Sequence, residues 1–316
     1  MKRILQYSTI IIAILGGWWA LNNQYAIRDW YTLRSYDPPA DIVQYANDTA
    51  MSDYGRKLFY VSDPQVEDKE EFNQNCQFTE RSIVLGCYTN SSIFLYGVDE
   101  ARLDGVEEVT AAHEMLHAGY SRLSSSEKKR VNGLLDKQME QLNDSRIKEL
   151  VEQYKKEDPD SLQNEMHSIF GTEVRELTPE LEEYYTQYFN DRLTVVAISE
   201  SYEQVFVDSN KRIVNLETDI AALKNQISQL EGAMTVIQVN INDESGRLDD
   251  LKASGDIPSY NAGVPAYNAM IVNYNSTVDS YKILVNQHND KVDERNRLAT
   301  DQNDLVHSLD SKYEKL

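Results

Sequence analysis

Two histidines and a glutamate in one short segment are the residues of this chain best suited to do chemistry. His113 and His117 are four positions apart, with Glu114 beside the first, in a chain that has only 5 histidines. Residues four apart lie on one face of a helix, so both imidazoles can bind the same metal ion. The carboxylate of Glu114 then lies beside the metal, where it can take a proton from a bound water. The segment predicts a hydrolytic metal site on a helix.

The flanking residues predict the elements that would position this site. Asp104 followed by Glu107 is typical of an N-cap with its capping-box partner, and it predicts a helix over about residues 104–122. Residues 82–85 and 92–96 are short runs of β-forming residues separated by Gly86 and a turn signal. We expect a hairpin just before the metal helix. Its free edge could hold an extended peptide by strand addition, or it could be an ordinary edge.

Two histidines leave a catalytic zinc ion one protein ligand short. The metzincin pattern H-E-x-x-H-x-x-G-x-x-H does not continue in this chain, because Tyr120 and Leu123 stand where the glycine and the third histidine belong. The better candidate is Glu165, which follows the second histidine by 165 − 117 = 48 residues.

The segment around Glu165 predicts a helix over about residues 161–170 that ends with Gly171 as its C-cap. His167 is a rival ligand. It lies about 200° from Glu165 around a helix, so the two side chains cannot face the same ion. Glu173 is a third, weaker candidate.

At Asn164-Glu165 the chain resembles the gluzincins, the thermolysin-like zinc metallopeptidases, whose third ligand is a glutamate on a later helix. The resemblance covers two short motifs and their order. It implies that His113, His117 and Glu165 bind one zinc ion per chain, with Glu114 as the general base of peptide-bond hydrolysis.

The chain departs from this family at Ile169, where thermolysin-like enzymes have an acidic residue that orients a ligating histidine. Ser168 or a backbone carbonyl could orient the histidine instead. The spacing between the two motifs is also longer than in thermolysin, so the resemblance is to the clan.

A zinc peptidase usually also has a hydrogen-bond donor for the oxyanion. A further helix is expected to begin at Thr178-Pro179, an N-cap followed by proline in the first turn. The candidate donors are His167 and the tyrosines of that helix, which could equally be packing residues: Tyr184, Tyr185 and Tyr188.

The two cysteines, Cys76 and Cys87, flank the first of the β-forming runs. In an oxidising compartment a disulfide between them would tie the hairpin beside the site and contribute about 3 kcal/mol. Two free thiols are the alternative. Neither cysteine belongs to a C-x-x-C string, so structural zinc and thioredoxin-like chemistry have no support.

The N-terminal segment predicts a membrane anchor. Lys2 and Arg3 precede residues 4–21, which carry no charge and end near Trp18 and Trp19. This length just spans a bilayer, and tryptophan favours the interface. We expect a single-pass protein of the cell membrane, with its N-terminus in the cytoplasm and the rest outside. A signal peptide that is cleaved to release a secreted protein is the alternative.

The net charge of −21 argues against nucleic acid as a partner. Such a charge is typical of a soluble, exported surface that resists association. The chain has no Gly-rich phosphate loop and no G-x-S-x-G string, so nucleotide-dependent and serine-hydrolase chemistry are not indicated.

The C-terminal third has a different pattern. From Ile213 to Ile241, apolar residues alternate in steps of three and four, which is typical of a coiled-coil seam. Residues 254–265 contain two glycines and two prolines and are expected to be a loop. A second seam runs from Tyr267 to Val292. Two such helices should fold back as an antiparallel hairpin, although pairing with another chain or a partner protein would use the same seam.

These observations together predict an α+β protein with four parts. They are an N-terminal transmembrane helix (1–22), a connector (23–50), a zincin-like domain with a small sheet packed on the H-E-x-x-H helix (51–200), and the helical hairpin (201–316). The expected function is that of a zinc-dependent endopeptidase that acts on peptide or protein substrates outside the membrane. The alternative is a catalytically inactive, zinc-binding adaptor that acts through its coiled coil.

Overall fold

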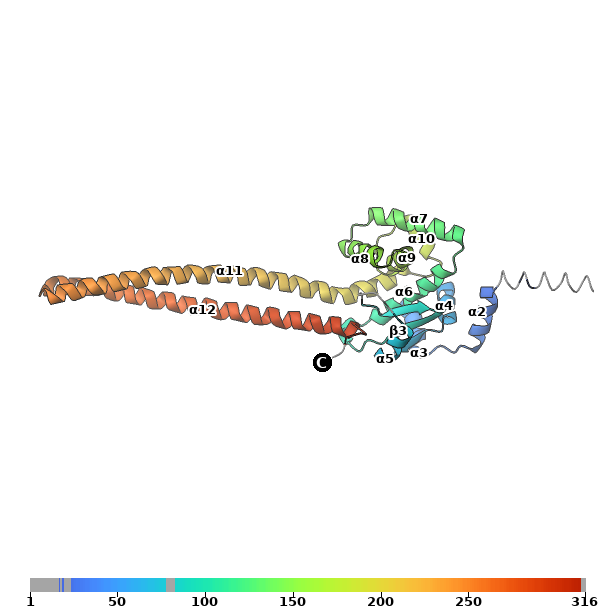
Figure 1. Cartoon of the computed structure of the whole chain (residues 1–316), viewed down its shortest axis with the longest axis horizontal. Helices are drawn as coiled ribbons and strands as arrows, with labels where there is room; N and C mark the ends of the chain where they lie inside the picture. The colour runs from blue at the N-terminus through green and yellow to red at the C-terminus, as the bar shows by residue number, and fades with distance from the viewer. Residues whose placement is uncertain (1–16, 18, 20–23, 78–82, 314–316) are drawn as a thin grey trace, which may run out of the picture. The chain divides into compact units, whose positions relative to one another are not determined.

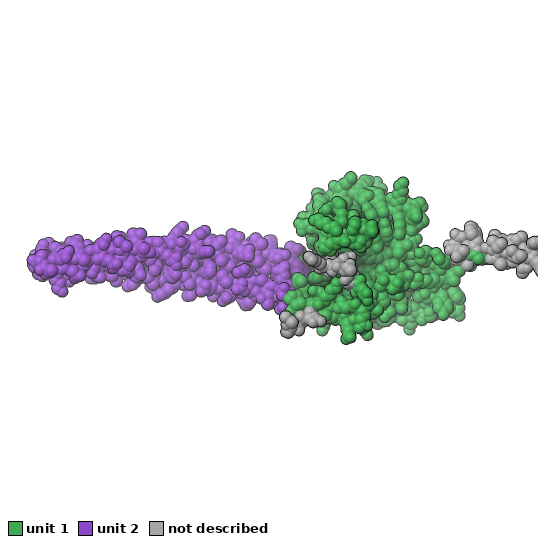
Figure 2. All heavy atoms as spheres, viewed as in Figure 1, with its two compact units in different colours: residues 1–205, 305–316 green, residues 206–304 purple. Residues whose placement is uncertain are grey.

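The computed structural model describes residues 17, 19, 24–77 and 83–313, in two compact units (Figures 1 and 2). Unit 1 comprises the described residues up to Val205 and those from Leu305 on, and unit 2 comprises residues 206–304. The structure is mostly helical with one small mixed sheet, followed by two long paired helices. The predicted α+β class is therefore confirmed.

Unit 1 is largely helical, and side chains at the helix starts explain several boundaries. Ser52, Asp68 and Asp144 are N-caps whose side chains accept hydrogen bonds from first-turn amides, and Ser124 forms a capping box with Glu127. The described helices of this unit are α2 (Gln24–Ser35), α3 (Ala40–Asp48), α4 (Asp53–Val61), α5 (Lys69–Asn75), η1 (Ala101–Leu103), α6 (Val106–Ser121), α7 (Ser125–Gln141), α8 (Ser145–Glu157), α9 (Leu162–Thr172) and α10 (Pro179–Tyr185). As expected, α10 has Thr178 as its N-cap and a proline in its first turn.

The sheet consists of β1 (Gln65–Glu67), β2 (Gly86–Thr89) and β3 (Ser92–Tyr96), in the order β1-β3-β2. Strand β3 is parallel to β1 and antiparallel to β2. The β2–β3 hairpin turns at Asn90 and Ser91, which have φ of 50° and 69°. The predicted hairpin is confirmed, and β2 is at the edge of the described sheet.

The predicted position of the first strand was wrong. Strand β2 begins at Gly86, whereas residues 83–85 precede it and Ser82 lies outside the described residues. A Cβ at Gly86 would lie 2.6 Å from Thr110 Cγ2 and 2.8 Å from Glu114 Cγ. The glycine that resembled a break in the sequence is therefore a strand residue, because only glycine lets the strand approach α6 so closely.

Helix α6 is the central element of unit 1. It packs against α3, α4, α9, β2 and β3, and most of its residues are buried, as expected for a helix inside a core. The predicted N-cap was wrong: α6 is preceded by Gly105 at φ 95°, without a side-chain cap. A Cβ at Gly105 would lie 2.3 Å from Ile198 Cγ2. The Glu107 carboxylate instead accepts hydrogen bonds from the Val98 N–H and the Tyr45 hydroxyl.

Residues 40–48, which the sequence assigned to a connector, form α3 and pack against α6. Ile42, Tyr45 and Ala46 are buried in the core. Their spacing of three and four places them on one helix face, a signal that the Pro38-Pro39 pair just before them obscured.

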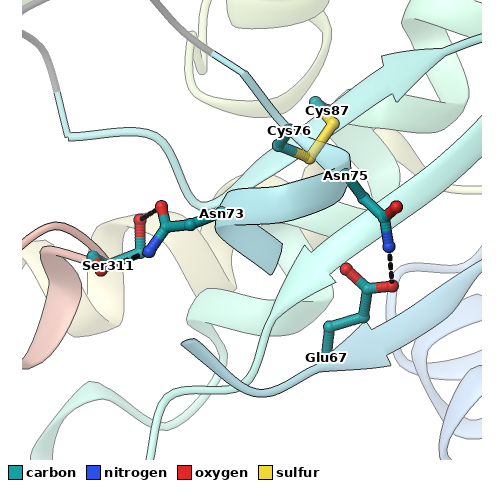
Figure 3. Close-up of a disulfide and its surroundings, with 6 residues drawn as sticks. All are labelled: Glu67, Asn73, Asn75, Cys76, Cys87 and Ser311. Carbon is teal, nitrogen blue, oxygen red and sulfur yellow. Dashed lines mark hydrogen bonds between the residues drawn. A yellow bond between two sulfur atoms is a disulfide. The ribbon is translucent and has the colours of Figure 1, made fainter. Parts of the chain in front are cut away.

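A disulfide connects Cys76, the C-cap of α5, to Cys87 of β2, which confirms the predicted pairing (Figure 3). Beside it, Asn73 Nδ2 donates to the Ser311 carbonyl at 2.6 Å, and Ser311 Oγ donates to Asn73 Oδ1 at 3.0 Å. The C-terminal segment of the chain is thereby attached to α5.

Helices α11 (Arg192–Ala253) and α12 (Ile257–Leu309) form an antiparallel hairpin within one chain, as predicted. In unit 2, Arg212 pairs with Glu294, and Lys291 Nζ lies 2.7 Å from Asp219 Oδ2. The Tyr281 hydroxyl donates to Glu231 Oε1 at 3.1 Å. These contacts join residues far apart in the sequence with the register that an antiparallel pair requires.

The loop between these helices is shorter than predicted. Helix α12 begins at Ile257, so the turn consists of residues 254–256, with Gly255 at φ 78°. Pro258 falls in the first turn of α12, where its missing N–H has no helical partner in any case. Helix α12 continues through Pro265.

None of the described helices is both long enough and apolar enough to cross a bilayer. The predicted membrane segment, residues 4–21, lies almost entirely outside the described residues.

Gly171 lies inside α9 and is not its C-cap, which is Glu173. A Cβ at Gly171 would lie 2.3 Å from Leu116 Cδ1 and 3.0 Å from Tyr185 Cε1. This glycine therefore allows α9 to pack closely on α6.

We predict that Gly171→Ala lowers the free energy of unfolding by about 1–3 kcal/mol, because the added methyl overpacks the α6–α9 contact. Helix propensity alone would favour alanine by about 1 kcal/mol, so the sign of the change is informative. The matched control is Gly133→Ala in α7, at an exposed position where a Cβ meets nothing within 4 Å. Urea unfolding of both variants measures the difference, and equal stabilisation would contradict the close-packing role.

Candidate metal centre

Helices α6 and α9 bring three side chains together that could hold a metal ion: His113, His117 and Glu165. One potential donor atom from each lies within 4.8 Å of the others. Glu165 Oε2 is 3.6 Å from His113 Nε2, and Glu165 Oε1 is 3.5 Å from His117 Nε2. The two imidazole rings are 4.8 Å apart between centroids, at an interplanar angle of 73°.

These separations suit a shared cation. Two donors bound at about 2.0–2.1 Å in tetrahedral geometry are about 3.3 Å apart. The nitrogen–oxygen distances are close to this value and longer than the usual 2.7–3.2 Å of an N–H···O hydrogen bond. The donor set, two imidazoles and a carboxylate, therefore fits a divalent ion.

Glu165 is the better placed of the two rival ligands on α9. Burial raises the pKa of its carboxyl, but the charges of His117 and His113 and a hydrogen bond from Tyr154 outweigh this effect, so the pKa is below its usual value. The carboxylate is therefore anionic, as a metal ligand must be. Tyr154 comes from α8, so a third helix orients this residue.

Glu114 lies on the same helix as the two histidines and is almost completely buried. Burial and, to a lesser extent, the nearby Glu165 raise the pKa of its carboxyl, while the charge of His117 and the Tyr88 backbone N–H lower it, and the resulting pKa is about 7. Its Oε2 has no hydrogen-bond partner among the described residues. The carboxylate thus retains an oxygen that can accept a proton.

A cavity of about 330 Å³ contains this group. One wall consists of residues 83–88, which include the start of β2. The remaining lining comes from helices α6, α8, α9 and α11, namely Val109, Thr110, His113, Glu114, His117, Leu150, Tyr154, Asn164, Glu165, Ile169, Glu173 and Tyr202. The mixture of apolar and ionisable residues is typical of a ligand-binding site.

His167 is buried outside this cavity. Its Nε2 lies 2.9 Å from the Tyr184 hydroxyl, and its backbone carbonyl accepts a hydrogen bond from the Tyr185 hydroxyl at 2.6 Å. Burial, together with the charges of His117 and His113, lowers the pKa of His167 to about 3. The ring is therefore neutral and belongs to a cluster of aromatic side chains.

The tyrosines that the sequence suggested as oxyanion donors belong to the same cluster. The hydroxyls of Tyr184 and Tyr188 are 3.0 Å apart, and none of the three side chains, including Tyr185, lines the cavity. The described tyrosines that do line the cavity are others: Tyr88, Tyr154 and Tyr202. The amphipathic pattern of α8 could have indicated the inward face of Tyr154, but its proximity to Glu165 depends on the tertiary fold.

Glu173, the third candidate ligand, lines the cavity but bonds to Arg146 at 2.9 Å and not to the histidines. Ser168 was proposed to orient a histidine. Its Oγ is buried without a hydrogen-bond partner among the described residues, and the same holds for His117 Nδ1. The group that orients His117 is therefore not Ser168 in this arrangement.

No family model, curated protein or solved structure matches this chain. The His-His-Glu group fits an H-E-x-x-H type of site, but it does not identify a family. The chemical interpretation of the cavity therefore depends on its own residues and geometry.

We predict that Glu165→Ala weakens binding of a divalent ion by more than the roughly 10–100-fold that the loss of an outer-shell partner costs, because it removes a donor. The matched control is Glu173→Ala, which removes a carboxylate from the same cavity but leaves the His-His-Glu group intact. Titration of the metal-stripped protein with zinc measures both affinities. Retention of the full affinity in the Glu165 variant would exclude it as a ligand.

Proposed function

We propose that this protein is a zinc-dependent endopeptidase. The observation that carries the proposal is the buried carboxylate of Glu114 beside a His-His-Glu group in a single cavity. Zinc is the ion that this donor set favours, and three protein ligands leave one position for water or substrate.

His113, His117 and Glu165 would hold the zinc ion. When bound, the ion would lower the pKa of water and polarise the scissile carbonyl. Glu114 accepts the proton of the attacking water and then delivers it to the leaving amine. Its Oε2 is buried and lacks a hydrogen-bond partner among the described residues, so this oxygen would hold the proton during the transfer.

Strand β2 supports a peptide as the substrate. It forms the edge of the described sheet and contributes Gly86, Cys87 and Tyr88 to the cavity. An extended chain that pairs with this edge would lie beside the cavity that His113, His117 and Glu165 also line. The reaction is therefore proposed to act on an extended segment of a polypeptide.

The second candidate function is that of a zinc-binding adaptor without activity. The observation in its favour is the hairpin of α11 and α12, which exposes apolar side chains, such as Val214, Val236 and Val272, that a protein partner or a second copy could cover.

We predict that Glu114→Gln reduces peptide cleavage by about 10²–10⁴-fold, since it removes the general base while it preserves the shape of the side chain. The zinc content should be unchanged, because Glu114 is not a member of the metal group. The matched control is Glu108→Gln, on the same helix but outside the cavity, which should cleave normally. Zinc-loaded protein that cleaves no member of a diverse peptide library would favour the adaptor instead.

We also propose that residues 4–21 anchor the protein in the cell membrane, with the cavity outside the cell. The support comes from the uncharged run after Lys2 and Arg3, and from the disulfide, which forms in oxidising compartments.

We predict that the full chain stays with the membrane fraction through an alkaline carbonate wash. Ile11→Lys with Ile14→Lys should release it, since each charge costs about 2.5–3.5 kcal/mol at the centre of a bilayer. The control, Ile11→Val with Ile14→Val, keeps the run apolar and should remain bound. Release of the unmodified chain by the wash would exclude the anchor.

A further inference from the structure

Helix α2 contacts the rest of unit 1 through a carboxylate. Asp29 is the one buried residue of this helix. Its Oδ2 lies 3.0 Å from Lys57 Nζ and 2.9 Å from Arg122 Nη1. Because Arg122 is the C-cap of α6, this ion pair connects α2 to the helix that carries both histidines.

The opposite face of α2 consists of Ile27, Trp30, Tyr31 and Arg34, which follow the i, i+3, i+4, i+7 spacing of one helical stripe. On a helix this stripe is centred on the side away from Asp29. Ile27, Trp30 and Tyr31 are 43%, 62% and 72% exposed. The guanidinium of Arg34 lies 5.4 Å from the centre of the Trp30 ring.

We expect these apolar side chains to be buried against another surface. A helix of 12 residues is marginal in water by itself, and the described part of unit 1 buries only Asp29 of it. Two aromatic rings and an isoleucine therefore remain in solvent. The helix that carries them, α2, is drawn in blue in Figure 1.

The position of α2 in the sequence indicates what covers it. The uncharged run ends at Leu21, three residues before α2 begins at Gln24, and three residues reach at most about 11 Å. The headgroup layer beyond the hydrocarbon core is about 5–8 Å thick on each side. If the run spans a bilayer, α2 begins at the level of the headgroups.

The composition of α2 fits the same place. Trp and Tyr favour the bilayer interface. Arg28 and Arg34 are exposed, while the single acidic residue, Asp29, is neutralised within the protein. In a chain with a net charge of −21, this helix is therefore a local surface that anionic headgroups can approach.

We propose that α2 lies on the bilayer surface, with the stripe of Ile27, Trp30, Tyr31 and Arg34 in the headgroup region of a membrane that contains anionic phospholipid. This inference rests on the proposed anchor and not on the peptidase chemistry. Through Asp29 and Arg122, the bilayer contact fixes the orientation of the metal-binding helix α6 relative to the membrane.

The test uses Trp30 as the probe. Trp18→Phe with Trp19→Phe leaves Trp30 as the only tryptophan of the full chain, which has 3. This protein is reconstituted into phosphatidylcholine–phosphatidylglycerol vesicles with brominated acyl chains, and into bromine-free vesicles as a control. We expect the brominated lipid to remove most of the Trp30 emission and aqueous iodide to have little effect. In a variant that also carries Ile27→Ser and Tyr31→Ser, we expect Trp30 to become accessible to iodide.

The possible results distinguish failure of the proposed membrane anchor from failure of the proposed surface contact of α2. If the chain does not float with the vesicles, the anchor and this proposal both fail. If it floats but Trp30 is quenched by iodide and unaffected by bromine, the anchor stands and the surface contact is overturned. Trp30 could instead be protected from both iodide and bromine, and lose this protection when the protein is diluted in the vesicles. That result would show that a second copy covers the stripe, and it would also overturn the proposal.

Discussion

The close contact between α6 and α9 is the constraint on which the geometry of the His-His-Glu group depends. The geometry of α6 alone places the two histidines on one face. The third side chain, Glu165, is on α9, so its distance from the histidines depends on how closely α9 packs against α6. Gly171 lies against Leu116 at this contact, with no room for a Cβ. A wider separation would leave Glu165 beyond the reach of an ion that the histidines hold.

The opposite side of α6 is constrained in the same way. Gly86 of β2 allows the strand to approach Thr110 and Glu114, and this approach brings the Tyr88 backbone N–H to the Glu114 carboxylate. A third glycine, Gly119, lies against the Tyr188 ring. The close approach of β2 at Gly86 contributes to the burial of Glu114. The same burial raises the pKa of Glu114, so its electrostatics follow from the packing.

The sequence predicted correctly those features that depend on residues close together in the chain. A spacing of four places His113 and His117 on one helix face, and a sustained alternation of three and four predicts the hairpin of α11 and α12. The β-forming run at residues 92–96 predicts β3, whereas the run at residues 82–85 precedes β2. The preference for Glu165 over His167 as the third ligand depended partly on the resemblance to a known clan. The roles of Gly86 and Gly171 were misassigned, because the sequence alone does not distinguish a glycine that ends an element from one that allows close packing. The cavity tyrosines were missed because the position of a hydroxyl depends on how distant helices cross.

The hairpin and the cavity share structural elements. Tyr202, on the first turns of α11, lines the cavity, and the same helix continues into unit 2 from residue 206. At the other end, the chain returns to unit 1 at Leu305, and Ser311 binds Asn73 of α5. Cys76, the C-cap of α5, is in turn bonded to Cys87 of β2 (Figure 3), and Cys87 also lines the cavity. Both ends of the hairpin are therefore connected to residues of the cavity. The N-terminal end is connected through α11 itself, and the C-terminal end through two hydrogen bonds and a disulfide. The Cys76–Cys87 disulfide is essential to the connection at the C-terminal end, because α5 itself contributes no residue to the cavity lining.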